Sequence, residues 1–107
     1  MEAPQPLRKK EDIVRVLRQG RRLHAPLFRL HMRAQKSSAV RVAIVVGVAV
    51  SKKAVVRNRI RRRTREAFLR ATAGHKGAFD AVILPNAQTE HAPFSELVSA
   101  FKKVLSS

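Results

Sequence analysis

Residues 40–70 have the sequence VRVAIVVGVAVSKKAVVRNRIRRRTREAFLR, and its two halves predict different elements. The first half, Val40–Val50, is rich in β-branched residues, which favours a strand that is buried on both faces. The second half, from Ser51 to about Arg70, is dense in charge and has its apolar residues at helical spacing, which predicts a long helix. A buried strand that leads into a basic helix therefore forms the centre of the predicted fold.

Weaker patterns on either side of this unit predict the remaining elements. They are a helix over Lys9–Gln19 that stops at Gly20, a short strand over Arg21–Ala25, a strand over Leu27–Arg33, a strand over Phe79–Leu84 and a helix over Phe94–Leu105. Residues 1–7 contain two prolines and are expected to form a disordered or extended arm before a domain of residues 8–105. No repeat or linker divides the chain, so we expect a single α+β domain in which helices cover a mixed sheet.

The charge of the chain is its most unusual property. Its 107 residues include 23 Lys and Arg but only seven Asp and Glu, which gives a formal net charge of +16. Like charges at this density repel one another in a compact state, and an anionic partner relieves that repulsion. Most of the cations are Arg, whose planar guanidinium suits phosphate and base recognition. A nucleic acid is the expected partner, and a merely solvated basic surface is the alternative.

Other functional classes lack the residues that they need. The chain has no Cys, which excludes a disulfide framework, a Cys-based zinc site and thiol chemistry. Its longest apolar run, Val42–Val50, is shorter than the roughly 20 residues of a membrane span, and its start does not resemble a signal peptide. We therefore expect a soluble, cytoplasmic protein. The acids show no paired metal-binding pattern, so we expect no catalytic group, metal or cofactor in the protein itself.

The basic helix predicted after Ser51 has three distinct sides at about 100° per residue. An apolar arc that suits docking on a sheet carries Val56, Ile60, Thr64, Ala67, Phe68 and Ala71. The first flank beside this arc is defined as Arg57, Asn58, Arg61, Arg62 and Arg65, and the second flank is Arg59, Arg63 and Arg70. Like charges three or four residues apart repel each other on a helix. The first flank therefore favours a phosphate-lined partner over a solvated face or a membrane surface.

Two polar residues near the start of this helix have alternative roles. Asn58 can cap a helix start, or it can donate and accept hydrogen bonds toward a base or ribose. Ser51 is a second candidate for the N-cap. The sequence alone does not choose between these roles.

The strand predicted over Leu27–Arg33 alternates between apolar and basic residues. Phe28, Leu30 and Met32 fall on one face, while Arg29, His31 and Arg33 fall on the other. We expect Phe28 to face the core. The basic face, with His31 available to stack on a base, is expected to lie open to solvent.

The segment that follows the buried strand resembles the signature of the ribonuclease P protein family. That signature is an Ala-Val-x-Arg-Asn-x-x-Lys/Arg-Arg-x-x-Arg run after a strand that ends in Ser-Lys-Lys. This chain has Ser51-Lys52-Lys53 followed by AVVRNRIRRRTR over residues 54–65. Flanking features occur in the family's order, namely Lys10-Glu11-Asp12, Gly20, Phe28, Arg41-Val42 and Phe79-Asp80. The resemblance covers almost the whole chain, from about Leu7 to Val104.

This resemblance implies a fold and a function. The fold is an α-β-β-β-α-β-α sandwich with a left-handed β-α-β crossover, like the second domain of a small-subunit ribosomal protein. The function is that of a non-catalytic subunit of ribonuclease P, which binds the catalytic RNA and the 5′ leader of precursor tRNA. The RNA subunit, using Mg²⁺, performs the endonucleolytic removal of the leader. The alternative is a ribosomal protein or a general RNA chaperone of similar fold.

The resemblance also assigns residues to two sites. Contacts with the RNA subunit are expected from Lys52, Lys53, Arg57, Asn58, Arg61, Arg62 and Arg65. A cleft between the first helix and the open sheet face, which holds the leader, is expected to include Ile13, Leu17, Arg29, His31 and Arg33.

The chain departs from the family pattern at three places. The aromatic residues usual in the leader cleft are absent, and Ile13 and Leu17 on the first helix and His31 on the strand stand there instead. A short glycine-containing insert usually separates Ser-Lys-Lys from Ala-Val, but here Lys53 directly precedes Ala54, so we expect a different loop before the helix. Arg63 and Thr64 stand where the family has apolar residues, which predicts looser packing of the helix.

Overall fold

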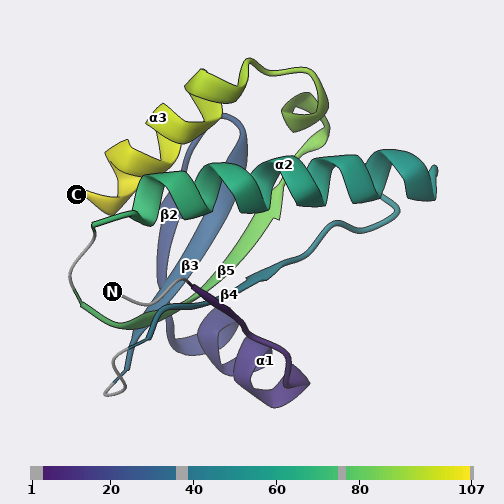
Figure 1. Ribbon diagram of the computed structural model, residues 1–107. Coiled ribbons are helices and arrows are strands. Elements are labelled where there is room, and N and C mark those ends of the chain that lie inside the picture. Colours follow the sequence, from purple (N-terminus) through teal and green to yellow (C-terminus); the bar gives the residue numbers. More distant parts are fainter. Residues whose placement is uncertain (1–3, 36–38, 75–76, 107) are drawn as a thin grey trace.

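A computed structural model of the chain describes residues 4–35, 39–74 and 77–106 and shows a five-stranded sheet between two layers of helix (Figure 1). The sheet order is β1-β4-β5-β3-β2. Along the chain the elements are β1 (Gln5–Pro6), α1 (Lys10–Gln19), β2 (Arg21–His24), β3 (Phe28–Ala34), β4 (Arg41–Ile44), α2 (Ala54–Thr72), β5 (Phe79–Pro85), the 3-10 turn η1 (Ala87–Glu90) and α3 (Phe94–Leu105). The predicted α+β sandwich is confirmed.

The alternation of side chains along the two central strands divides the core between the faces of the sheet. On one face, Phe28 of β3 and Ile83 of β5 pack with α2 and α3, and the Phe28 ring stacks on Phe101 with centroids 4.1 Å apart. On the other face, Val82 of β5 packs with Val16 of α1. The α2 and α3 side contains most of the buried apolar residues. Figure 1 shows both helices on that side of the sheet.

The first helix ends where its contact with β3 leaves no room for a side chain. A Cβ atom added at Gly20 would collide with the backbone carbonyl groups of Val16 and Met32. The predicted stop at Gly20 is confirmed, and its cause is this close approach of the helix end to the strand.

The strand predicted over Val40–Val50 is much shorter in the structure. β4 ends at Ile44, and the chain then leaves the sheet, with 40% of Val45 and 69% of Val48 exposed. A turn over Val48–Val50 carries the chain to the start of α2. The prediction was wrong because β-branched residues indicate extended backbone but do not supply a neighbouring strand.

The N-terminal arm is extended where its residues are described, as one of the two expected forms, but it is part of the sheet rather than free. Gln5 and Pro6 pair in parallel with Arg41 and Val42 as an added edge strand, and Leu7 is only 4% exposed. The two prolines are tolerated because an edge strand leaves one side of its backbone unpaired. Residues 1–3 lie outside the described part of the chain. None of the helices within that part is long and apolar enough to span a membrane.

Candidate nucleic-acid interface

The first flank of α2 presents cations that have no acidic partner within the described residues. Asn58, Arg62 and Arg65 are exposed, while Arg57 and Arg61 are half-buried. The ion pairs found in that part of the chain involve none of these arginines. Their charges are thus available to phosphate groups, and the structure brings all five predicted residues together on one side of the helix.

Two hydrogen bonds hold side chains of the first flank in place. The Arg57 guanidinium donates to the backbone oxygen of Ser51 at 2.9 Å, which ties the start of α2 to the preceding loop. The Arg61 guanidinium donates to Oδ1 of Asn58 at 2.7 Å. Asn58 therefore does not cap the helix: it lies on the exposed flank and orients a neighbouring arginine.

The start of α2 adds further positive charge. Lys52 and Lys53, which the family resemblance assigns to the RNA-subunit contact, are both exposed there. The N-cap is Lys53, which makes no side-chain cap hydrogen bond, and the first turn contains no acidic residue. Ser51 lies too early to cap the helix, although its hydroxyl accepts a hydrogen bond from the Lys53 amide at 3.2 Å. The partial positive charge of the helix end is thus added to the two lysines.

The second flank of α2 is used inside the protein. Arg59 forms an ion pair with Glu90 at 2.6 Å, and the guanidinium carbon of Arg70 lies 5.2 Å from the centre of the Phe94 ring. Arg63 donates to the backbone oxygen of Thr89 at 3.3 Å and also to that of Ala92. The looser packing predicted from Arg63 is therefore wrong, because its guanidinium supplies a charged donor to the segment before α3.

Thr64 does not loosen α2 either. It is fully buried, and its hydroxyl donates to the backbone oxygen of Ile60 at 2.7 Å. A buried hydroxyl that is hydrogen-bonded within the helix can pack beside apolar residues without a large penalty.

The sequence predicted that His31 lies on an open face, but in the structure it does not. Its side chain points to the α1 side of the sheet, but only 4% of the residue is exposed and neither ring nitrogen has a hydrogen-bond partner among the described residues. The two-residue period of β3 correctly predicts the face, but this part of the face is covered. In this conformation His31 cannot stack on an RNA base.

The surroundings of His31 disfavour its protonated form. Burial, and then the positive charges of Arg22 and Arg29 and the nearby His24, hold the pKa of His31 below its ordinary value of 6.5. The imidazole is therefore a neutral part of the contact between α1 and the sheet at neutral pH.

The two apolar residues assigned to the leader cleft lie on the side of α1 that packs toward the sheet. Ile13 and Leu17 are half-buried, and they pack with Leu7, Val16 and Val82 beneath α1. Arg29 is exposed on β3, and Arg33 is half-buried opposite Asp80 of β5. Of the predicted leader-binding residues, only Arg29 is exposed, whereas His31 is buried and the others are half-buried.

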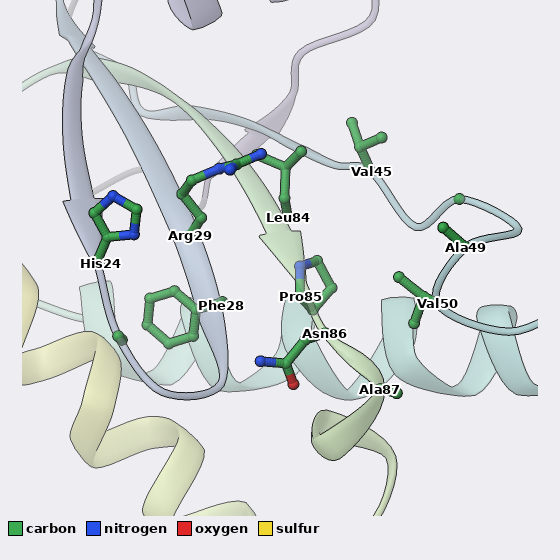
Figure 2. A pocket seen from close by; sticks show the side chains of 12 residues that line it. His24, Phe28, Arg29, Val45, Ala49, Val50, Leu84, Pro85, Asn86 and Ala87 are labelled. Atoms are coloured by element: carbon green, nitrogen blue, oxygen red, sulfur yellow. The ribbon is translucent and has the colours of Figure 1, made fainter.

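A hollow of about 600 Å³ lies next to Arg29. It is formed by the end of β2 with His24 and Ala25, the start of β3 with Phe28 and Arg29, parts of the segment 45–50, and the residues 84–87 at the end of β5. Figure 2 shows the Arg29 side chain reaching across toward Leu84, with His24 on one side and Val45 on the other. This hollow is lined mostly by apolar side chains together with the cationic Arg29, and its size is that of a small-ligand site. The sequence did not reveal the hollow, because four separate segments form it.

The sequence also did not reveal the ion pair in which Arg41 donates two hydrogen bonds to Asp80, at 2.8 and 2.7 Å. These bonds raise the pKa of Arg41. The pair joins β4 to β5, and Arg41 also makes a longer contact with Asp12 of α1. The signal for this pair is a lone acid in an otherwise apolar strand, and its role is structural. Among the described residues no three His, Asp or Glu side chains lie together as a metal-binding group.

Comparison with known proteins gives a family. A family model described as Ribonuclease P matches residues 1–107. The ribonuclease P protein component of Bartonella quintana is 36% identical over 104 residues, covering 91% of this chain and 77% of the relative. The corresponding protein of Brucella suis is 37% identical over 107 residues, covering 91% and 74%.

Solved structures agree with the fold. The RNase P protein from Thermotoga maritima superposes with a TM-score of 0.81 at 26% identity and covers 94% of both chains. The RNase P protein of Staphylococcus aureus has a TM-score of 0.78 at 22% identity over 94% of this chain and 92% of that one, which shows the shared fold.

Proposed function

Because this chain belongs to the ribonuclease P protein family, we propose that it is the RNA-binding protein subunit of a ribonuclease P that removes the 5′ leader of precursor tRNA. The observation that carries the proposal is the first flank of α2, on which arginines lie in a row without acidic partners in the described residues. A row of this kind matches the regular spacing of negative charge along an RNA backbone.

The first flank, together with Lys52 and Lys53, is the proposed contact with the catalytic RNA subunit. The hydrogen bond from Arg61 to Asn58 fixes one guanidinium before RNA binds, which reduces the conformational entropy lost on association. Phosphate contacts from such residues position an RNA and contribute salt-dependent affinity.

The hollow beside Arg29 is the proposed site for the leader of precursor tRNA. An unpaired nucleotide has an apolar base and an anionic phosphate, and the hollow offers apolar side chains such as Leu84 and Val45 next to the Arg29 guanidinium. The base would pack against the apolar floor, while Arg29 binds the adjacent phosphate. This proposal moves the leader site along the sheet, away from His31 and the buried side of α1.

The phosphodiester hydrolysis is assigned to the RNA subunit with Mg²⁺, and the protein is assigned the binding of RNA and leader. Cations at the first flank neutralise phosphates and so lower the concentration of Mg²⁺ that the folded RNA needs. This role places the protein in the cytoplasm, together with the precursor tRNA.

The test is cleavage of a precursor tRNA by the RNA subunit encoded in the same genome, with and without the protein, at low Mg²⁺. We expect the protein to restore cleavage under conditions in which the RNA alone is inactive, and we expect RNA-free protein to cleave nothing. Cleavage by the protein alone would contradict the assignment of catalysis to the RNA. Equal affinity for the RNA subunit and for an unrelated structured RNA would favour a general RNA chaperone instead.

A further inference from the structure

One wall of the hollow belongs to a short segment that is fixed to α2. This segment, here called the bracket, runs from Asn86 to Ala92 and contains η1. Its first residues, Asn86 and Ala87, line the hollow directly after Leu84 and Pro85 (Figure 2). The position of the bracket therefore sets the position of that wall.

The second flank of α2 holds the far end of the bracket. Glu90 forms an ion pair with Arg59 at 2.6 Å, and the Glu90 side chain is only 16% exposed. Arg63 donates to two bracket carbonyl groups, those of Thr89 and Ala92. Charged donors of this kind form strong and directional hydrogen bonds, so the bracket is fixed relative to the helix axis.

The near end of the bracket is held by the turn between β2 and β3. The Asn86 side chain donates to the backbone oxygen of Pro26 at 2.8 Å, and the Asn86 amide donates to that of Leu27 at 3.1 Å. The hydroxyl of the fully buried Thr89 donates to the same Leu27 oxygen at 2.9 Å. The bracket is thus anchored to the turn that precedes Phe28 and Arg29, on the opposite side of the hollow.

These contacts link the basic helix to the hollow. We infer that Arg63 and Glu90 are positioning residues that hold the bracket so that the hollow fits a single-stranded nucleotide of the leader, an inference that rests on the proposed leader site. Neither residue is assigned to the RNA-subunit contact, because Arg63 lies on the second flank of α2 and Glu90 lies in η1, paired with Arg59 of that flank. The same helix then binds the RNA subunit with one flank and shapes the leader site with the other.

The charge of Glu90 makes a decisive test possible. Removing a negative charge from a protein strengthens RNA binding if long-range electrostatics is all that matters. In Glu90→Gln the bracket loses its ion pair with Arg59. We therefore expect weaker binding of the leader, which is the opposite of the electrostatic effect. The ratio of affinities for precursor and mature tRNA, measured with the assembled ribonucleoprotein, should fall by about two- to fivefold.

Arg63→Lys provides a second variant that keeps the charge and is expected to fold. A lysine ammonium cannot reproduce the planar set of donors that bonds two carbonyl groups at once. We expect the preference for precursor over mature tRNA to fall by roughly tenfold while the affinity for the RNA subunit stays the same. Lys102→Gln, which changes a charge on α3 without touching the bracket, is the matched control and should leave both quantities unchanged.

The possible outcomes separate the two proposals. If the unmodified protein shows no preference for precursor tRNA, the proposed leader site itself fails. If the unmodified protein shows that preference, and Glu90→Gln and Arg63→Lys lower only the melting temperature, the bracket is merely structural and the positioning inference is overturned. An increased preference in Glu90→Gln would also overturn it, in favour of simple charge repulsion.

Discussion

The two flanks of α2 are built from nearly the same residue type, and yet their side chains have different partners. On the first flank, Arg62 and Arg65 are exposed to solvent and form no ion pair within the described part of the chain. On the second flank, Arg59 and Arg63 reach back to the segment between β5 and α3. The helix is therefore basic on both sides but offers its charge to an external partner on only one.

The difference shows that the surroundings of an arginine, rather than its presence in a motif, decide its role. An arginine within reach of a carboxylate or of backbone carbonyl groups forms internal bonds, as Arg59 and Arg63 do. An arginine without such neighbours retains an unneutralised charge. The phosphate groups of a nucleic acid can neutralise several such charges at once. The predictions below compare the two flanks, from the largest expected effect to the smallest.

The double variant Arg61→Ala, Arg65→Ala should have the largest effect, on binding to the RNA subunit. Each lost phosphate contact reduces the slope of log affinity against log salt by about one unit, so we expect a slope flatter by about two units. The measurement is a binding titration at several salt concentrations. Arg59→Ala, Arg70→Ala removes the same charge from the second flank and should change the slope much less. Equal slopes for the two double variants would remove the distinction between the flanks.

Besides the loss of precursor preference expected from its positioning role, the removal of Arg63 in Arg63→Ala should lower the stability of the RNA-free protein. The backbone oxygens of Thr89 and Ala92 lose a charged donor, and we expect the free energy of unfolding to fall by about 2 kcal/mol. Urea denaturation measures this change. Arg62→Ala, on the exposed side of the same helix, is the control and should change stability by no more than about 0.5 kcal/mol. A larger loss in Arg62→Ala than in Arg63→Ala would reverse the assignment of the flanks.

His31→Phe tests a region away from both flanks and should have a smaller effect, with a distinct pH dependence. Because the pKa of folded His31 lies below 6.5, the unfolded chain binds its proton more readily, and stability falls as the pH drops below about 6.5. Phenylalanine removes two unpaired buried nitrogens, so we expect a gain of about 1 kcal/mol at pH 7 and a weaker loss toward pH 5. Unfolding curves at several pH values give both quantities. The salt slope of RNA binding should not change, and an identical pH profile in the variant would contradict the buried neutral imidazole.

The smallest expected effect concerns Arg70 on the second flank. Its guanidinium lies over the Phe94 ring, a contact that contributes about 0.5 kcal/mol when it is exposed to solvent. A double-mutant cycle with Arg70→Gln and Phe94→Leu should show a coupling energy of about this size in urea denaturation. A coupling energy near zero would show that the ring contact with Phe94 does not stabilise the protein.

The sequence predicted the helices, the paired strands and the first flank, because each depends on local periodicity. α3 has the predicted bounds, and β3 alternates as its residues indicated, with Phe28 in the core. The length of β4 and the exposure of His31 were predicted less well. Alternation assigned His31 to the correct face of the sheet but could not show that this part of the face is covered. The hollow could not be predicted, since it joins segments separated by up to about 60 positions.

By itself, then, the sequence determined that this chain is a basic α+β domain with a row of arginines on one helix. Helical and strand periods are properties of neighbouring residues, and they are present before the chain folds. Only the tertiary structure decided which arginines remain free, because Glu90 and the carbonyl groups of Thr89 and Ala92 approach α2 only when η1 packs beside it. It likewise decided that His31 is buried and that Arg29 borders a hollow, since both depend on which segments meet across the sheet.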